Sequence, residues 1–87
     1  MKKILMFVMA SCPHCRRAHE IMQELREKNP KYNELEIEII DEVEQPELAN
    51  QYDYYYVPTF YVDGKKLHEG VPSYESIENV FKTAYES

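Results

Sequence analysis

The first third of the chain has the pattern of a buried strand followed by an amphipathic helix. Residues 2–8 form a short, mainly apolar run, which is typical of a strand buried on both faces. A helix is predicted to begin near Cys12, because Pro13 suits a first helical turn, and to end at Asn29-Pro30. Four apolar residues share one face of this helix and should point to the core: Ala18, Ile21, Met22 and Leu25.

The middle of the chain predicts a second strand and a short helix. Residues 35–39 alternate strictly between aliphatic and carboxylate side chains, which predicts a half-exposed strand with its carboxylates outward. Outward charges discourage pairing with other chains, so this strand suits the edge of a sheet. Pro46 is predicted to open a short helix that runs to about Tyr52 and buries Leu48 and Tyr52.

The last third predicts a hairpin and a third helix. Two short strands, residues 60–62 and 65–68, flank Asp63-Gly64, a pair that readily adopts the positive φ angles of a two-residue hairpin turn. Ser73 is a suitable cap for the final helix. The apolar stripe of that helix comprises Ile77, Val80, Phe81 and Ala84.

The predicted element order is βαβαββα, which describes an α/β fold in a single domain over residues 1–87. The two strands joined through the first helix should be parallel, and the hairpin adds two antiparallel strands. We therefore expect a four-stranded mixed sheet with helices on both faces. A chain of 87 residues buries too little surface to enclose a deep site, so its chemistry should lie at the surface.

Charge and hydropathy exclude several classes of function. The formal net charge is −6, from 10 Lys and Arg against 16 Asp and Glu, which argues against nucleic-acid binding. The apolar run at residues 4–10 is far shorter than the roughly 20 residues that span a bilayer. Residues 1–12 imitate a bacterial lipoprotein leader, but their apolar stretch is at the lower limit for one, so we expect a cytoplasmic protein.

Both cysteines of the chain stand in one motif, Cys12-Pro13-His14-Cys15, where the first predicted strand gives way to the first helix. A structural disulfide here would close too short a loop to remove much entropy from the unfolded chain. A zinc site would need two more ligands, and the chain has no second cysteine pair. Inert buried thiols are a third alternative, and a redox-active dithiol is the interpretation that we favour.

The start of the helix gives the physical reason for a redox-active dithiol. Unpaired N–H groups and the macrodipole stabilise an anion at a helix N-terminus, so the pKa of the Cys12 thiol should fall. Cys12 is then the exposed nucleophile, and Cys15, one turn further in, is the resolving thiol. Pro13 and His14, which lie between them, are expected to tune the Cys12 thiolate.

Together with the element order and the downstream segment Val57-Pro58-Thr59-Phe60, the Cys12-Pro13-His14-Cys15 motif resembles the glutaredoxin-like branch of the thioredoxin superfamily. The resemblance covers almost the whole chain and implies a thioredoxin/glutaredoxin-like fold. It also implies that Pro58 is cis and lies against the thiols, whereas the residues alone leave its isomer open. Val57 precedes a proline and is pushed to an extended conformation, in which its backbone can pair with an extended substrate segment.

The sequence departs from dithiol glutaredoxins at positions that would contact glutathione. Met9 stands where those proteins usually carry a lysine. Gly70-Val71 stands where they have two glycines followed shortly by an aspartate. Residues 33–53 also carry eight acids and no bases, which repels an anionic tripeptide if this segment lies near the site.

The sequence therefore predicts a thiol–disulfide oxidoreductase that exchanges electrons between the Cys12/Cys15 dithiol and protein or low-molecular-weight disulfides. Val57 and Pro58 would dock the substrate, and Tyr56 with its neighbouring tyrosines would either contact the substrate or pack within the rim. No metal or organic cofactor is implied, the reductant is glutathione or a flavoprotein reductase, and we expect a monomer. Two alternatives stay open: a non-catalytic binding module of thioredoxin fold, and a metal or Fe–S carrier that binds through Cys12.

Overall fold

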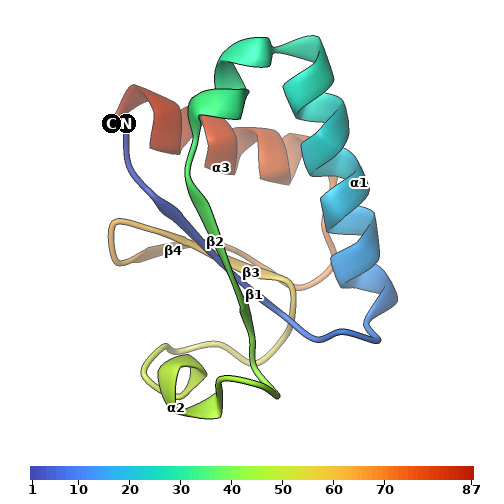
Figure 1. The fold of residues 1–87 in the computed structure, drawn as a ribbon, viewed down its shortest axis with the longest axis vertical. Coiled ribbons are helices and arrows are strands. Elements are labelled where there is room, and N and C mark those ends of the chain that lie inside the picture. Colours follow the sequence, from blue (N-terminus) through green and yellow to red (C-terminus); the bar gives the residue numbers. More distant parts are fainter.

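Eight elements make up the fold in the computed structural model, which describes residues 1–87. In chain order they are β1 (Ile4–Val8), α1 (Pro13–Lys28), the 3-10 helix η1 (Pro30–Glu34), β2 (Ile37–Asp41), α2 (Pro46–Ala49), β3 (Thr59–Val62), β4 (Lys65–Glu69) and α3 (Tyr74–Glu86). The four strands, which are labelled in Figure 1, form one sheet in the order β2-β1-β3-β4.

The sheet is mixed, as the sequence predicted. Strand β1 pairs in parallel with β2, from Ile4 opposite Ile37 onward, and α1 makes the crossover between them. Strand β1 pairs antiparallel with β3, and β3 pairs antiparallel with β4 across the hairpin. Strand β2 lies at one edge of the sheet, the position that the carboxylates in its sequence predicted.

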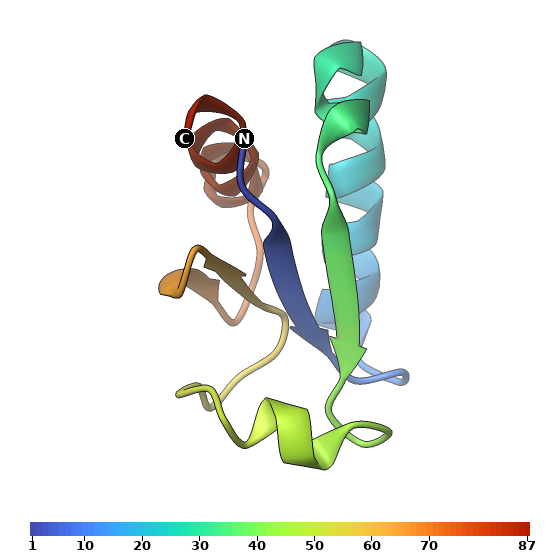
Figure 2. The ribbon, with the colours of Figure 1, turned by 60° about the vertical axis from the view of Figure 1, so that its left-hand side comes forward.

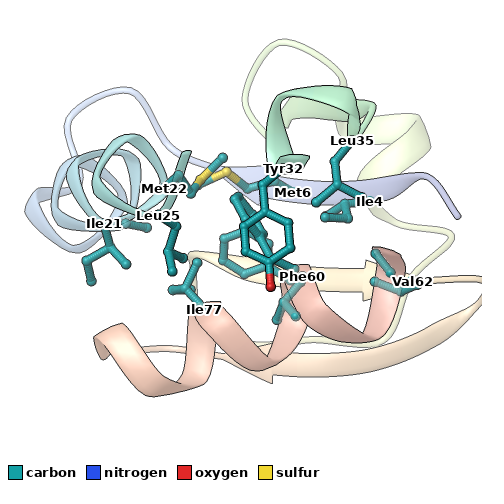
Figure 3. Packing of buried hydrophobic residues seen from close by; sticks show 14 of the residues in the cluster. Ile4, Met6, Ile21, Met22, Leu25, Tyr32, Leu35, Phe60, Val62 and Ile77 are labelled. Atoms are coloured by element: carbon teal, nitrogen blue, oxygen red, sulfur yellow. The ribbon is translucent and has the colours of Figure 1, made fainter. Parts of the chain in front are cut away.

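The larger hydrophobic cluster packs α1 and α3 against one face of the sheet. It joins 16 buried residues, and Figure 3 shows how side chains from both helices meet those of β1 and β3. Burial of these apolar faces is what stabilises helices of this length, since isolated helices are marginal in water. All the residues of the two predicted helical stripes belong to it: Ala18, Ile21, Met22, Leu25, Ile77, Val80, Phe81 and Ala84.

A smaller cluster lies on the other face of the sheet, where α2 packs. It comprises four buried residues: Phe7, Ile40, Ala49 and Tyr61. The Phe7 ring also contacts the rings of Tyr52 and Tyr54, with both pairs of centroids 4.9 Å apart. Figure 2 shows α2 beside the carboxyl end of β2, apart from α1 and α3. Helices therefore cover both faces of the sheet, as predicted.

The predicted strand at residues 35–39 is displaced along the chain. Residues before it form η1, and pairing with β1 begins only where the Ile4 amide donates to the Glu36 carbonyl at 3.0 Å. The strand therefore runs from Ile37 to Asp41. Its fully buried residue is Ile40, beyond the predicted strand, whereas Ile39 is 47% exposed because the sheet ends at β2.

The prediction for the second helix was also partly wrong. Helix α2 ends at Ala49 and is followed by a turn, so it does not reach Tyr52. Ala49 is the residue that α2 buries, while Leu48 and Tyr52 are half-buried. The physical reason is length, because a single helical turn presents only one position squarely to the sheet.

The hairpin and the last helix form as predicted. The φ angles of Asp63 and Gly64 are +53° and +79°, which a two-residue hairpin turn requires. At the start of α3, the Ser73 hydroxyl accepts a hydrogen bond from the Ser76 amide at 3.1 Å. The Ser76 hydroxyl also accepts one from the Ser73 amide at 3.0 Å, which completes a reciprocal cap.

Candidate active site

Cys12 occupies the cap position at the start of α1. Its φ and ψ are −87° and 118°, an extended conformation, and Pro13 is the first residue of the helix proper. The carbonyl of Cys12 accepts the first helical hydrogen bond, from the Arg16 amide at 3.2 Å. No acidic residue lies in the first turn, so the positive end of the helix dipole is left for another anion.

The environment of Cys12 favours its thiolate. Partial burial raises the pKa of the Cys12 thiol, but hydrogen bonds from the Cys15 amide and thiol and from the His14 amide outweigh it. The net result is a pKa below the ordinary value of 9.0, although the nearby negative charge of Glu42 acts in the opposite sense. The amide hydrogens at the start of α1 therefore lower the pKa of the Cys12 thiol, as the sequence predicted.

Cys15 lies in the opposite environment, one helical turn away. It is only 3% exposed and belongs to the larger hydrophobic cluster. The pKa of the Cys15 thiol is raised to about 11, mainly by burial and in part by its hydrogen bond to Cys12. At neutral pH one sulfur is therefore biased toward the thiolate and the other remains a thiol that donates to it.

The loop before β3 brings a second segment against Cys12. The Val57-Pro58 peptide bond is cis. The Cys12 Sγ lies 3.9 Å from the Val57 carbonyl oxygen, although the two residues are 45 positions apart in the chain. The Pro58 carbonyl accepts a hydrogen bond from the Gly70 amide at 2.9 Å, which ties this loop to the end of β4.

The tyrosine-rich stretch divides into two parts. Tyr52 and Tyr54 pack on Phe7 in the smaller cluster. Tyr55 and Tyr56 point to solvent, with 86% and 69% of their surface exposed, directly before the cis peptide. Packing and an exposed aromatic rim were alternatives in the sequence, and the structure contains both.

The His14 side chain is exposed, and the part of this residue that acts on Cys12 is its backbone amide. In the next turn, Arg17 pairs with Glu20 at 3.2 Å and with Glu24 at 3.9 Å. This ion pairing directs the Arg17 charge along the helix surface.

A hollow of about 230 Å³ opens beside the two thiols on the α1 side. Met9 lines it, which leaves an apolar side chain where dithiol glutaredoxins usually carry a lysine. His19 lines it as well, and its place four residues after Cys15 on the same helix was the signal that could have located it there. The complete lining comprises Val8, Met9, Ala10, Cys12, Cys15, Arg16 and His19.

Sequence reasoning missed two carboxylates at this end of the molecule. Glu42 follows β2, its amide donates to the Val8 carbonyl at 3.0 Å, and its charge acts on both thiols. A signal for it existed, because parallel strands end at the same edge of a sheet, so the residues after β1 and β2 meet there. The Glu69 carboxylate accepts hydrogen bonds from backbone amides in the loop before β3, and no local pattern in the sequence indicates that contact.

The structure contains neither a cluster of side chains that could hold a metal ion nor a helix that could span a membrane. Nowhere do three or more His, Cys, Asp or Glu side chains converge in a way that could hold a metal ion. Every helix is too short or too polar to cross a bilayer.

Comparisons with known proteins agree with this geometry. The family model described as Thioredoxin domain matches residues 2–82. A thioredoxin from Methanocaldococcus jannaschii is 31% identical over 80 residues, which are 92% of this chain and 92% of that protein. The oxidised thioredoxin from Plasmodium falciparum has a TM-score of 0.71 at 19% identity, over 99% of this chain and 82% of that one. A protein disulfide oxidoreductase from Aeropyrum pernix has a TM-score of 0.70 at 25% identity, over 98% of this chain and 38% of that one.

The fold is α/β with a mixed sheet, and it carries a dithiol at a helix N-terminus. Together with these relatives, these features define a thiol–disulfide oxidoreductase. The chain belongs to the thioredoxin family. The predicted superfamily is thereby confirmed, whereas the assignment to its glutaredoxin-like branch stays a prediction.

Proposed function

We propose that Cys12 is the attacking thiol and Cys15 the resolving thiol in the reduction of protein disulfides. The Cys12 thiolate attacks one sulfur of the substrate, which forms a mixed disulfide and releases the other sulfur as a thiolate. Cys15 then loses its proton to that leaving group and attacks the Cys12 sulfur. This attack releases the second substrate sulfur as a thiolate and leaves a Cys12–Cys15 disulfide. The substrate has gained two electrons and the Cys15 proton, and its remaining thiolate takes its proton from water.

The observation that carries this assignment is the opposite environment of the two sulfurs. Amide hydrogens at the start of α1 lower the pKa of Cys12, while burial raises that of Cys15 to about 11. A thiolate at neutral pH is both the better-populated nucleophile and the better leaving group. The half-buried Cys12 sulfur therefore starts the reaction, and the buried Cys15 sulfur is used only after a mixed disulfide has formed.

The segment with the cis peptide bond, Val57-Pro58, is called the cis-proline loop, and its position favours an extended protein segment as the substrate. Val57 lies outside the regular sheet pairing, and its carbonyl lies 3.9 Å from the Cys12 sulfur. An extended chain that pairs with this backbone would place its disulfide over Cys12, which is recognition by strand addition. The exposed side chains of Tyr55 and Tyr56 extend this surface with apolar contact area.

A flavoprotein reductase fits as the source of electrons better than glutathione does. Met9 lines the hollow beside the thiols, where a lysine would be needed to hold a glutathione carboxylate. The Glu42 charge near both thiols also disfavours an anionic tripeptide. We expect turnover with NADPH and a flavoprotein reductase to exceed turnover with glutathione and glutathione reductase.

The test is reduction of insulin together with trapping of a mixed disulfide. Cys12→Ser should abolish insulin reduction, because it removes the attacking thiolate. Cys15→Ser should accumulate a mixed disulfide between Cys12 and the substrate, visible by mass spectrometry under non-reducing conditions. The outcome against the proposal is a wild-type protein that reduces nothing while Cys12→Ser retains partner binding, which would identify a binding module. Iron or zinc copurifying anaerobically in a Cys12-dependent manner would identify a metal carrier.

A further inference from the structure

The carboxylate of Glu69 holds the chain just before the cis-proline loop. Glu69 is the last residue of β4, and one of its oxygens accepts hydrogen bonds from two consecutive amides. These are the amides of Tyr55, at 2.5 Å, and Tyr56, at 3.0 Å. Two neighbouring N–H groups that converge on one oxygen form a small anion-binding concavity, which a carboxylate fills well.

Strand β4 and the residue after it make further contacts with this segment. Lys66 donates to the other carboxylate oxygen of Glu69 at 2.7 Å and to the Asp53 carbonyl at 3.3 Å. The Gly70 amide donates to the Pro58 carbonyl at 2.9 Å. Residues 53–58 are thus tied to β4 at their start, middle and end, although they belong to no strand or helix.

The two tyrosines that Glu69 holds by their amides have exposed side chains. Tyr55 and Tyr56 donate their N–H groups to Glu69, and their side chains are 86% and 69% exposed. Their aromatic surface is therefore held open beside Val57 and does not collapse onto the smaller cluster as Tyr52 and Tyr54 do.

We propose that Glu69 is a positioning residue that holds residues 55–58 in the geometry in which they dock a protein substrate over Cys12. The inference rests on the proposed function, because it assumes that substrates pair with Val57. A docking segment that is already ordered does not lose its conformational freedom when a partner binds, so affinity improves. Glu69 acts through the backbone of the loop and has no part in the chemistry of the sulfurs.

The Glu69 carboxylate is suited to a permanent role. Its hydrogen bonds from Lys66 and from the Tyr55 and Tyr56 amides lower its pKa to about 2. The carboxylate therefore remains ionised throughout the pH range of thiol–disulfide exchange, and the docking segment should stay in place across that range.

Two substrates separate docking from sulfur chemistry. Insulin needs the docking segment, whereas hydroxyethyl disulfide is too small to use it. For Glu69→Ala we expect the KM for insulin to rise about tenfold with kcat nearly unchanged, because two charge-assisted hydrogen bonds are lost. The rate with hydroxyethyl disulfide and the pKa of Cys12 should both match the wild type. Glu69→Gln keeps an oxygen acceptor for the amides and should raise the KM for insulin by only about threefold.

A matched control removes a surface ion pair elsewhere on the sheet. Glu38→Ala breaks the 2.9 Å pair with Lys3 and should leave the KM for insulin unchanged. Hydrogen exchange adds a direct readout, since the Tyr55 and Tyr56 amides should lose protection in Glu69→Ala and keep it in Glu38→Ala. If Glu69→Ala does not fold, the KM for insulin and the hydrogen exchange are both measured on Glu69→Gln.

These outcomes distinguish a failure of the proposed function from a failure of the positioning role of Glu69. A wild-type protein that reduces neither disulfide contradicts the proposed function itself. An active wild type whose KM for insulin is the same in Glu69→Ala contradicts the positioning role alone. Equal losses with insulin and with hydroxyethyl disulfide, accompanied by a changed Cys12 pKa, also overturn it, because Glu69 would then act on the sulfur.

Discussion

Two identical side chains, three positions apart, acquire opposite acidities from their surroundings. Cys12 lies at the end of a helix, where amides converge on its sulfur, and Cys15 lies inside the hydrophobic cluster. The negative charge of Glu42 raises the pKa of both thiols, so it opposes the thiolate that the helix end favours. Its hydrogen bond from the Tyr54 hydroxyl, at 2.8 Å, keeps this carboxylate in place.

Removing the Glu42 charge should therefore make the dithiol more acidic. For Glu42→Gln we expect the Cys12 pKa to fall further below its ordinary value, because one opposing charge is gone while the amides remain. Thiolate absorbance at 240 nm, followed against pH, measures the change. Glu44→Gln on the same loop is the matched control and should leave the Cys12 titration unaltered. An unchanged titration in Glu42→Gln would mean that solvent screens this carboxylate from the sulfur.

At the residue scale, sequence alone predicted the parts of the candidate site that depend on local structure. Cys12 at a helix start follows from a motif next to Pro13, whereas the extended conformation expected of Val57 stays a prediction. Glu69 was out of reach, because its contact depends on which surfaces two distant elements present to each other. The position of His19 could have been predicted, since it follows Cys15 by four residues on the same helix. A carboxylate that accepts backbone amides from another loop leaves no periodic pattern in its own strand.

At the element scale, α3 offers a test of how much a single cap contributes. Ser73→Ala removes the hydroxyl that accepts from the Ser76 amide and should destabilise the protein by about 1 kcal/mol. Urea unfolding measures the difference. Ser87→Ala is the matched control at the other end of the same helix, where the hydroxyl donates to the Thr83 carbonyl. It should cost well under half as much, so equal losses from both variants would contradict a specific role for the cap.

The elements that sequence predicted well are those with long or distinctive patterns. Helices α1 and α3 bury every residue of their predicted stripes, and the Asp63-Gly64 turn sets the hairpin register as far as Tyr61 opposite Lys66, beyond which the register shifts. The poorly predicted elements are short ones whose limits depend on neighbours. Strand β2 starts where β1 offers a partner, at Ile37, and not where the alternation of residues starts. Helix α2 ends after one turn, in which Ala49 is buried in the smaller cluster and Leu48 packs against it half-buried.

At the scale of the whole molecule, chemistry lies at the end of the sheet where β1 and β2 finish. The loop after β1 supplies Cys12, the loop after β2 supplies Glu42, and the loop before β3 supplies Val57. A chain of 87 residues has no room for an enclosed pocket, so a half-buried sulfur at the surface and a docking backbone take its place. The buried side of the same site, Cys15, remains part of the core, and its titration is therefore coupled to global stability.

This coupling predicts a loss of stability of the reduced protein in alkali. The Cys15 pKa is about 11 in the fold against an ordinary 9.0, so between these values the unfolded chain has lost the Cys15 proton and the folded chain still holds it. Unfolding then becomes easier as pH rises from 9 to 11, by ~3 kcal/mol at the upper end, since each pKa unit corresponds to about 1.4 kcal/mol. The lowered pKa of Cys12 acts in the opposite sense, but its contribution stops growing about one unit above the unfolded value of 9.0, so the loss at higher pH is not masked. Urea unfolding of reduced protein at several pH values should show this loss in the wild type and a smaller one in Cys15→Ser, where the raised pKa values of Tyr32, Tyr54, Lys3 and Lys66 still contribute. Parallel pH profiles for the two proteins would contradict a buried, proton-holding Cys15.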